Sequence, residues 1–223
     1  YTPEQNAVSV AELVFGMMLS LARHVPAASR SARDGEWDRH RFMGVELYGK
    51  TLGIIGLGRI GHRVGIRARA FGMDIVAYDP FVRADGVVAS ELRAEVVGFR
   101  EALSRSDFVS CHMPLTDETR GLFDAAAFSA MKPTAYFVNA ARGGVVDEPA
   151  LIDALDTGRI AGAALDVRVT EPPEPSPLDT MDNVILTPHI AALTDAAQER
   201  VVASLCRDVA AVLRGETPAH RAV

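Results

Sequence analysis

Six apolar runs, each short enough for a strand, alternate with helix-like segments along most of the chain. Runs that are apolar at nearly every position are typical of strands buried on both faces. When such strands alternate with helices, the helices cover both faces of one parallel sheet. The alternation therefore predicts the α/β class and a doubly wound parallel sheet. The runs are "TLGIIG", "DIVAYDP", "DFVSCHMP", "TAYFVNAARG", "IAGAALDV" and "NVILTPHI".

The first run continues into Gly56, Gly58 and Gly61, which form a G-x-G-x-x-G pattern. Between a strand and a helix, this spacing is typical of a dinucleotide-binding turn. Gly56 would permit a sharp turn, Gly58 would let the backbone approach a pyrophosphate, and Gly61 would let the helix pack against the strand. The glycines alone would fit an ordinary tight turn equally well, so the assignment depends on the residues around them.

An acidic residue, Asp79, ends the second predicted strand about twenty residues beyond the glycines, as a dinucleotide site requires. Its carboxylate can accept hydrogen bonds from the adenosine ribose hydroxyls. The same negative charge would repel the 2′-phosphate of NADP, and no arginine directly follows it. Together with the glycines, Asp79 predicts NAD as the cofactor.

Arg142, Glu171 and His189 each follow a predicted strand, where open α/β sheets bind ligands. A carboxylate that bonds one imidazole nitrogen favours the imidazolium, which can exchange a proton with a substrate oxygen. An arginine presents a planar pair of donors to a substrate carboxylate. Taken singly, the three are more typical of a surface ion pair, a solvated loop and a structural histidine. Together they predict hydride transfer at a 2-hydroxy or 2-oxo acid.

Composition and charge argue against several other function classes. The 223 residues carry a formal net charge of −6, and a chain without a basic excess is a poor partner for nucleic acid. Its two cysteines, Cys111 and Cys206, lie far apart, which argues against a disulfide framework and predicts a cytoplasmic location. No Cys/His cluster has metal-ligand spacing, so no metal site is expected.

The apolar segment from Ala11 to Ala22 is expected to form a helix buried against protein. It contains Glu12 and is too short to cross a bilayer, so no membrane partner is predicted. The apolar residues of this helix cover more of it than one core-facing stripe needs. This predicts a homodimer through the helix; the alternative is that a further domain covers it. These residues are Val10, Leu13, Val14, Met17, Met18 and Leu21.

Several longer stretches resemble the nucleotide-binding domain of the NAD-dependent D-2-hydroxyacid dehydrogenases, and together they span nearly the whole chain. They are "NAVSVAELVFGMMLSLAR", "GKTLGIIGLGRIG", "FVNAARGGVVDEPALIDAL", "AGAALDV" and "NVILTPHIA". The stretch "FMGVELYGKTLGIIGLGRIG" is most similar to the phosphoglycerate dehydrogenase branch. The resemblance implies an enzyme that transfers a hydride between NAD and a D-2-hydroxy acid or 2-oxo acid. The alternative is a relative that binds NAD without turnover, as corepressors of this fold do.

The resemblance also implies a role for each site residue. Arg142 would hold the substrate carboxylate and carbonyl, and Glu171 would orient His189. His189 would donate the proton in reduction and accept it in oxidation. The other residues would line the cofactor: Arg59 and Ile60 at the pyrophosphate, Met113 and Pro114 at the adenine, and Ala140, Ala141, Asp166 and the turn from His189 to Ala192 at the nicotinamide. Asp166 could instead cap the turn that follows its strand.

The ends of the chain are expected to belong to a larger protein. The chain begins Tyr1-Thr2-Pro3, without a methionine, and members of the family carry a substrate domain built mostly from an upstream segment. We therefore expect residues 1–193 to form the NAD-binding domain. Residues 194–223, with a helix from about Thr194 to Arg214, would lead back towards a substrate domain that is mostly absent.

A basic cluster, which includes Arg39 and Arg41, lies in the loop before the first predicted strand. Charge clusters of this kind are usually solvated. The alternative is that a dimer partner offers these residues to a phosphate on the substrate, as in some phosphoglycerate dehydrogenases.

Overall fold

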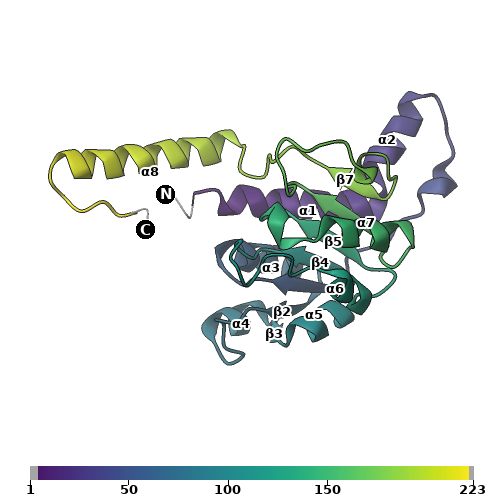
Figure 1. Cartoon of the computed structure of the whole chain (residues 1–223), viewed down its shortest axis with the longest axis horizontal. Helices are drawn as coiled ribbons and strands as arrows, with labels where there is room; N and C mark the ends of the chain where they lie inside the picture. The colour runs from purple at the N-terminus through teal and green to yellow at the C-terminus, as the bar shows by residue number, and fades with distance from the viewer. Residues whose placement is uncertain (1–4, 221–223) are drawn as a thin grey trace.

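The computed structural model describes residues 5–220. Its strands are β1 (Thr51–Ile55), β2 (Asp74–Tyr78), β3 (Glu95–Val96), β4 (Phe108–Cys111), β5 (Tyr136–Asn139), β6 (Gly162–Leu165) and β7 (Val184–Leu186). They form one sheet in the order β3-β2-β1-β4-β5-β6-β7, in which every neighbouring pair is parallel. The predicted doubly wound α/β fold is confirmed (Figure 1).

Helices cover both faces of this sheet (Figure 1). One face carries α1 (Ala7–Arg23), α3 (Arg59–Ala70) and α4 (Val87–Leu92), and the other carries α5 (Phe99–Arg105), α6 (Ala125–Ala130) and α7 (Glu148–Asp156). The remaining helical elements are α2 (Val25–Arg33), α8 (Asp195–Leu213) and the short 3₁₀ helices η1 (Arg39–Phe42), η2 (Gly143–Val145) and η3 (Pro177–Asp179).

The strands that follow the predicted runs send side chains into two separate cores, which explains why these runs are apolar at successive positions. In β1, Leu52 and Ile54 join the core with α1 and α3, whereas Ile55 joins the core with α5 and α6. In β5, Val138 joins the first core and Phe137 the second. Six strands coincide with the predicted runs, while β3 has only 2 residues and follows no apolar run.

The prediction that α1 carries an unpaired apolar surface is wrong. The wide apolar face of this helix arises because α1 packs against α3 on one side and against β5 and β6 on another. Five of its apolar residues are 5% exposed or less, and the sixth packs against the same core; these are Val10, Val14, Met17, Met18 and Leu21, with Leu13 the sixth. The residues of α1 therefore give no support for a dimer interface.

Within residues 5–220, no single helix is both long and apolar enough to cross a membrane. The helices α1 and α2 reach the required length together, but they are bent by 63° at the break between them.

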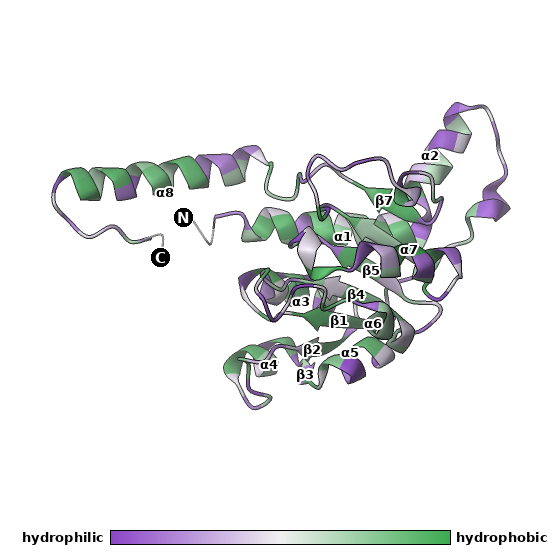
Figure 2. Ribbon diagram, in the orientation of Figure 1, coloured by the Kyte–Doolittle hydropathy of each residue, from purple (hydrophilic) through white to green (hydrophobic). Residues whose placement is uncertain are grey.

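The helix α8 extends away from the body of the molecule (Figure 1). Thr194 caps it by accepting a hydrogen bond from the N–H of Ala197 at 3.2 Å, and the same hydroxyl meets that of Ser9 on α1 at 2.8 Å. Further along, the helix exposes five large apolar side chains: Val202, Leu205, Val209, Val212 and Leu213. The ribbon of α8 is accordingly mostly green in Figure 2. The helix agrees with the predicted one, whereas the division at residue 194 stays a prediction. Residues 1–3, on which the expectation of an upstream segment depends, lie outside the described residues.

Candidate functional site

The predicted glycine turn lies where the neighbouring strands β1 and β4 end, at the point where the winding of the sheet reverses. Gly56 has a φ of +99°, and a Cβ there would lie 2.8 Å from the carbonyl carbon of His112. A Cβ on Gly61 would lie 2.1 Å from the carbonyl oxygen of Gly56, so α3 packs directly on the turn. Around Gly58, by contrast, no atom lies within 4 Å of the Cβ position. The turn is therefore closed towards the protein and open on the side where a ligand would approach.

These features fit a dinucleotide. Gly58 carries no side chain to cap α3, so the first N–H groups of this helix can meet a pyrophosphate. Asp79 lies beside the turn: one carboxylate oxygen accepts a hydrogen bond from the N–H of Leu57 at 2.8 Å, and the other from the N–H of Phe81 at 2.8 Å. Each oxygen retains a lone pair for a ribose hydroxyl. Asp79 thus holds the glycine turn in place, a function that the sequence did not indicate.

A cleft of about 640 Å³ is lined by Ile60 at the start of α3, by residues directly after β4 and β5, and by the loop of His189. It brings together many of the predicted cofactor residues: Ile60, Met113, Pro114, Ala140, Ala141, Arg142, His189 and Ala192. Ala191 also lines the cleft, as the prediction for the turn from His189 to Ala192 requires, whereas the other lining residues were not among the predicted sites: Asn6, Val10, His112 and Leu115. The position of His112 and Leu115 directly after β4, next to the glycine turn, is the sequence signal that could have marked them.

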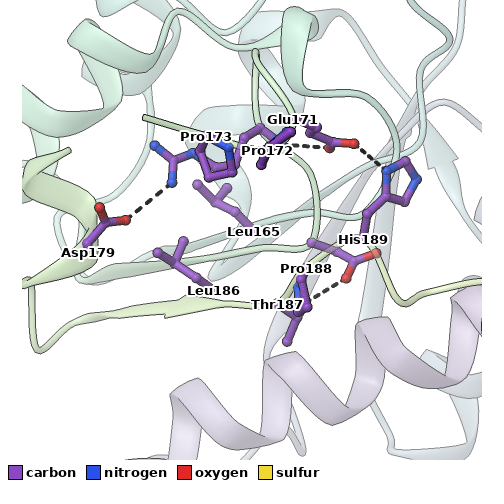
Figure 3. A pocket seen from close by; sticks show the side chains of 11 residues that line it. Leu165, Glu171, Pro172, Pro173, Asp179, Leu186, Thr187, Pro188 and His189 are labelled. Carbon is purple, nitrogen blue, oxygen red and sulfur yellow. Dashed lines mark hydrogen bonds and ion pairs between the residues drawn. The ribbon is translucent and has the colours of Figure 1, made fainter. Parts of the chain in front are cut away.

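The imidazole of His189 is paired with the carboxylate of Glu171. Its Nδ1 lies 2.6 Å from Oε2 of Glu171 (Figure 3). Because a carboxylate can only accept a hydrogen bond, Nδ1 carries the proton, and Nε2 is the nitrogen that can exchange a proton with a substrate. Both side chains are partly exposed, which leaves them within reach of a small molecule.

Partial burial raises the pKa of the Glu171 carboxyl, but other contributions outweigh it. The hydrogen bonds from His189 and from the N–H of Arg168 lower this pKa, and so do the positive charges of His189 and Arg142. The net result is a pKa below the ordinary value for a glutamate. Glu171 is therefore ionised at neutral pH and can stabilise a positive charge on His189.

Asp166 organises the turn that carries His189. Its carboxylate accepts hydrogen bonds from the hydroxyl of Thr187 at 2.6 Å and from the N–H groups of Ile190 and Ala191, both at 2.8 Å. His189 itself has a φ of +54°, which is uncommon for a residue other than glycine, and its N–H donates to the carbonyl of Asp166 at 2.8 Å. Asp166 is only 1% exposed, so the geometry favours the alternative in which it caps the turn.

Arg142 follows β5, and the side chain of Asn139 holds the backbone around it. The amide of Asn139 accepts a hydrogen bond from the N–H of Ala141 and donates one to the carbonyl of Arg142, both at 3.0 Å. Asn139 was not among the predicted site residues, although its place at the last position of a strand was the available signal. A second cavity, of about 200 Å³, is lined by Arg142, Glu171 and His189 together. The structure therefore brings the three predicted catalytic residues to one cavity.

Other residues lie away from this cavity or are unsuited to its chemistry. Arg39 and Arg41 are exposed on η1, and Arg41 lies 3.8 Å from the carboxylate of Glu36. Burial raises the pKa of Cys111 to about 12, so its thiol stays protonated at neutral pH. Across the described part of the chain, no three His, Cys, Asp or Glu side chains are grouped as a metal site would need.

Most of the chain matches the model of one protein family. Residues 15–191 match the model of the D-isomer specific 2-hydroxyacid dehydrogenase NAD binding domain. The chain belongs to this family. It is 49% identical over 215 residues to a D-3-phosphoglycerate dehydrogenase of Methanocaldococcus jannaschii, covering 96% of this chain and 41% of that protein. A rat D-3-phosphoglycerate dehydrogenase is 48% identical over 199 residues, which cover 89% of this chain and 37% of the relative. The chain thus spans about two fifths of the length of these relatives.

Solved structures agree with the family assignment. A D-lactate dehydrogenase from Aquifex aeolicus, complexed with NAD and lactic acid, has a TM-score of 0.88 and 34% identity, covering 96% of this chain and 68% of that one. The TT0316 protein of Thermus thermophilus has a TM-score of 0.92 and 36% identity, covering 100% of this chain and 70% of that one. The family and the open glycine turn together identify NAD as the cofactor of this domain.

Proposed function

We propose that this chain is the cofactor-binding and catalytic part of an NAD-dependent D-2-hydroxyacid dehydrogenase. One observation carries the proposal: Glu171, His189 and Arg142 line one cavity, with His189 paired to Glu171 at 2.6 Å. His189 and Arg142 also line the cleft that reaches Ile60, at the start of α3 and beside the glycine turn. Proton donor, carboxylate ligand and cofactor cleft are therefore contiguous.

Each residue then has a defined task in the reduction of a 2-oxo acid. The guanidinium of Arg142 binds the substrate carboxylate through paired hydrogen bonds and holds the carbonyl towards the cleft. Nε2 of His189 donates its proton to the carbonyl oxygen as negative charge develops there. Bound NADH supplies the hydride. In oxidation, His189 accepts the hydroxyl proton instead.

Glu171 acts through His189. Its carboxylate fixes the tautomer that leaves Nε2 towards the substrate and stabilises the imidazolium that forms in oxidation. Its lowered pKa keeps it ionised under the conditions in which this support is needed.

The substrate is a D-2-hydroxy acid or its 2-oxo counterpart, and the names of the relatives favour 3-phosphoglycerate within this class. The test is turnover by the full-length protein on a panel of 2-hydroxy acids with and without a phosphate, followed by the absorbance of NADH. Activity on the panel supports a dehydrogenase. NAD binding without turnover of any member would favour a binding module of the corepressor type.

We also propose that the protein is a cytoplasmic homodimer, associated through the α2–β1 segment (residues 34–50). What supports this interface is its exposed aromatic and apolar surface, since Trp37 is 88%, Met43 76% and Tyr48 76% exposed. Arg39 and Arg41 lie on the same segment and would be offered to the substrate phosphate of the partner protomer. Replacing both arginines with Ala should then raise the KM for 3-phosphoglycerate but not for an acid without phosphate. Equal effects on the KM values for both acids would indicate that Arg39 and Arg41 are solvated loop residues.

A further inference from the structure

Arg168 lies 3 residues before Glu171 on the loop that follows β6, and its guanidinium is nearly buried. The side chain is 9% exposed and forms a two-bond pair with Glu148: Nε lies 3.1 Å from Oε1, and Nη2 lies 3.0 Å from Oε2. Glu148 stands in the first turn of α7 and is itself 18% exposed in its side chain. The proposed reaction uses neither residue.

The same carboxylate also holds the backbone of the loop. Oε1 of Glu148 accepts a hydrogen bond from the N–H of Val169 at 2.8 Å. One residue earlier, the N–H of Arg168 donates to Oε1 of Glu171 at 3.1 Å, while Oε2 of Glu171 bonds His189. The contacts therefore run without a gap from α7 through the loop backbone to the imidazole.

Two further contacts tie this loop to its surroundings. Nη1 of Arg168 lies 3.5 Å from the carboxylate of Asp179, which also accepts the N–H of Ser176 at 2.8 Å and so anchors the end of the loop after Glu171. On the other side, a Cβ on Gly143 would lie 1.9 Å from the carbonyl oxygen of Arg168. The backbone of Arg168 thus packs directly against the residue after Arg142.

Glu148 and Arg168 carry opposite charges that favour each other. The hydrogen bonds that Arg168 donates to Glu148 raise the pKa of Arg168, against the opposing effect of its burial. Burial raises the pKa of Glu148, but the hydrogen bonds from Arg168 and Val169 outweigh it and leave this pKa below the ordinary value. A shielded ion pair of this kind adds little net stability compared with an apolar replacement, and its better supported use is to fix one arrangement.

We propose that Glu148 and Arg168 form a positioning pair that fixes the Glu171 carboxylate against His189. The role rests on the proposed function, in which His189 exchanges the substrate proton. Arg168 lines the cavity of about 200 Å³ beside Glu171 and His189, and Glu148 does not. Neither residue lines the cofactor cleft of about 640 Å³, so the pair acts at the Glu171–His189 bond and not at the cofactor. Both members of the pair are required. The carboxylate of Glu148 binds the Arg168 guanidinium through two hydrogen bonds and also accepts one from the N–H of Val169, so it holds the side chain and the loop backbone together.

The test uses the full-length protein with Arg168→Gln, Glu148→Gln and the milder Arg168→Lys. We expect Arg168→Gln and Glu148→Gln each to lower kcat about tenfold, the scale of a small misplacement of a catalytic group, with KM and NAD affinity within about twofold of the original. Arg168→Lys should recover part of the loss. Arg105→Lys is the matched control, because Arg105 also pairs with two carboxylates, Glu95 and Glu101, but lies in α5.

A double-mutant cycle separates positioning from a general effect on the fold. If Arg168 acts through Glu171, adding Arg168→Gln to Glu171→Gln costs little or nothing further in kcat. An equal loss in both backgrounds would overturn the proposal. NMR titration of the His189 ring in this chain gives a readout without turnover: Arg168→Gln should move its midpoint in the same direction as Glu171→Gln. An unmoved midpoint overturns the positioning pair, whereas absence of turnover in the unmutated protein overturns only the proposed function.

Discussion

At the residue scale, the carboxylate of Glu171 is the charge that pairs with the imidazole of His189. The hydrogen bonds from His189 and from the N–H of Arg168 outweigh the effect of burial and lower the pKa of Glu171, so this carboxylate is ionised throughout the neutral range. The lowered pKa of Glu171 contributes to the free energy of unfolding. This contribution is present above the unfolded-state pKa of a glutamate, about 4.3, and is lost as the pH falls through the lower folded value.

Replacing Glu171 with Gln keeps the size of the side chain and removes its charge. A protonated His189 then loses its partner, so the fall in reductive activity with rising pH should move to lower pH. The pH–rate profile of the full-length protein checks this, with Glu174→Gln, an exposed glutamate of the same loop, as the control. A profile that does not change would contradict the pairing.

Asp79 should determine the choice between NAD and NADP. Asp79→Ala removes the acceptor for the ribose hydroxyls and the charge that repels a 2′-phosphate, so NAD affinity should fall by about tenfold, the effect of one charged hydrogen bond. The gap between the two cofactors should narrow as well. Calorimetry on this chain measures both, and Asp74→Ala, exposed at the opposite end of β2, is the control. Equally tight binding of NADP and NAD by the unmutated chain would contradict this role.

At the scale of elements, two glycines of one turn should behave differently. A Cβ on Gly61 would collide with the carbonyl of Gly56 at 2.1 Å, so Gly61→Ala should lower the free energy of unfolding by about 1–3 kcal/mol. Gly58→Ala meets open space and should change it by no more than about 0.5 kcal/mol. It should still weaken NAD binding, because the methyl group occupies the side on which the pyrophosphate approaches. Urea unfolding and calorimetry distinguish the two variants, and equal effects on stability would contradict the packing of α3 on the turn.

The order of strands and helices could be predicted because burial on both faces leaves a run of apolar residues that is visible in the sequence. β3 could not be predicted, since its 2 residues form no such run. The wide apolar face of α1 was visible, but the sequence does not show whether a second protomer or the chain's own α3 covers it. In the structure α3 and the sheet do so.

The site was predictable to the extent that its residues follow strands. Arg142, Glu171 and His189 meet because the carboxyl ends of parallel strands lie along one edge of the sheet. The hydrogen-bond networks around these three residues could not be predicted from the sequence. Asn139 and Asp166 hold turns through contacts that depend on exact backbone paths, and Glu148 reaches Arg168 from a separate helix.

At the scale of the whole molecule, the proposed dimer gives a distinct prediction. Trp37→Asp should shift the protein from dimer towards monomer in light scattering, because it places a charge within the exposed surface of residues 34–50. Phe81→Asp is the control, since Phe81 is 93% exposed and lies outside this segment. A dimer that survives Trp37→Asp would exclude residues 34–50 as the interface and favour the exposed apolar face of α8. An unmutated protein that is a monomer at high concentration would contradict the dimer itself.

The central claim, that this chain holds the proton donor of a dehydrogenase beside bound NAD, is tested most directly by His189→Ala in the full-length protein. NADH formation with 3-phosphoglycerate, or with whichever acid of the panel is turned over, should slow by at least about 100-fold, the usual scale for the loss of a general acid or base. NAD affinity, measured by calorimetry on the same sample, should change little. Turnover at an undiminished rate by His189→Ala would contradict the claim.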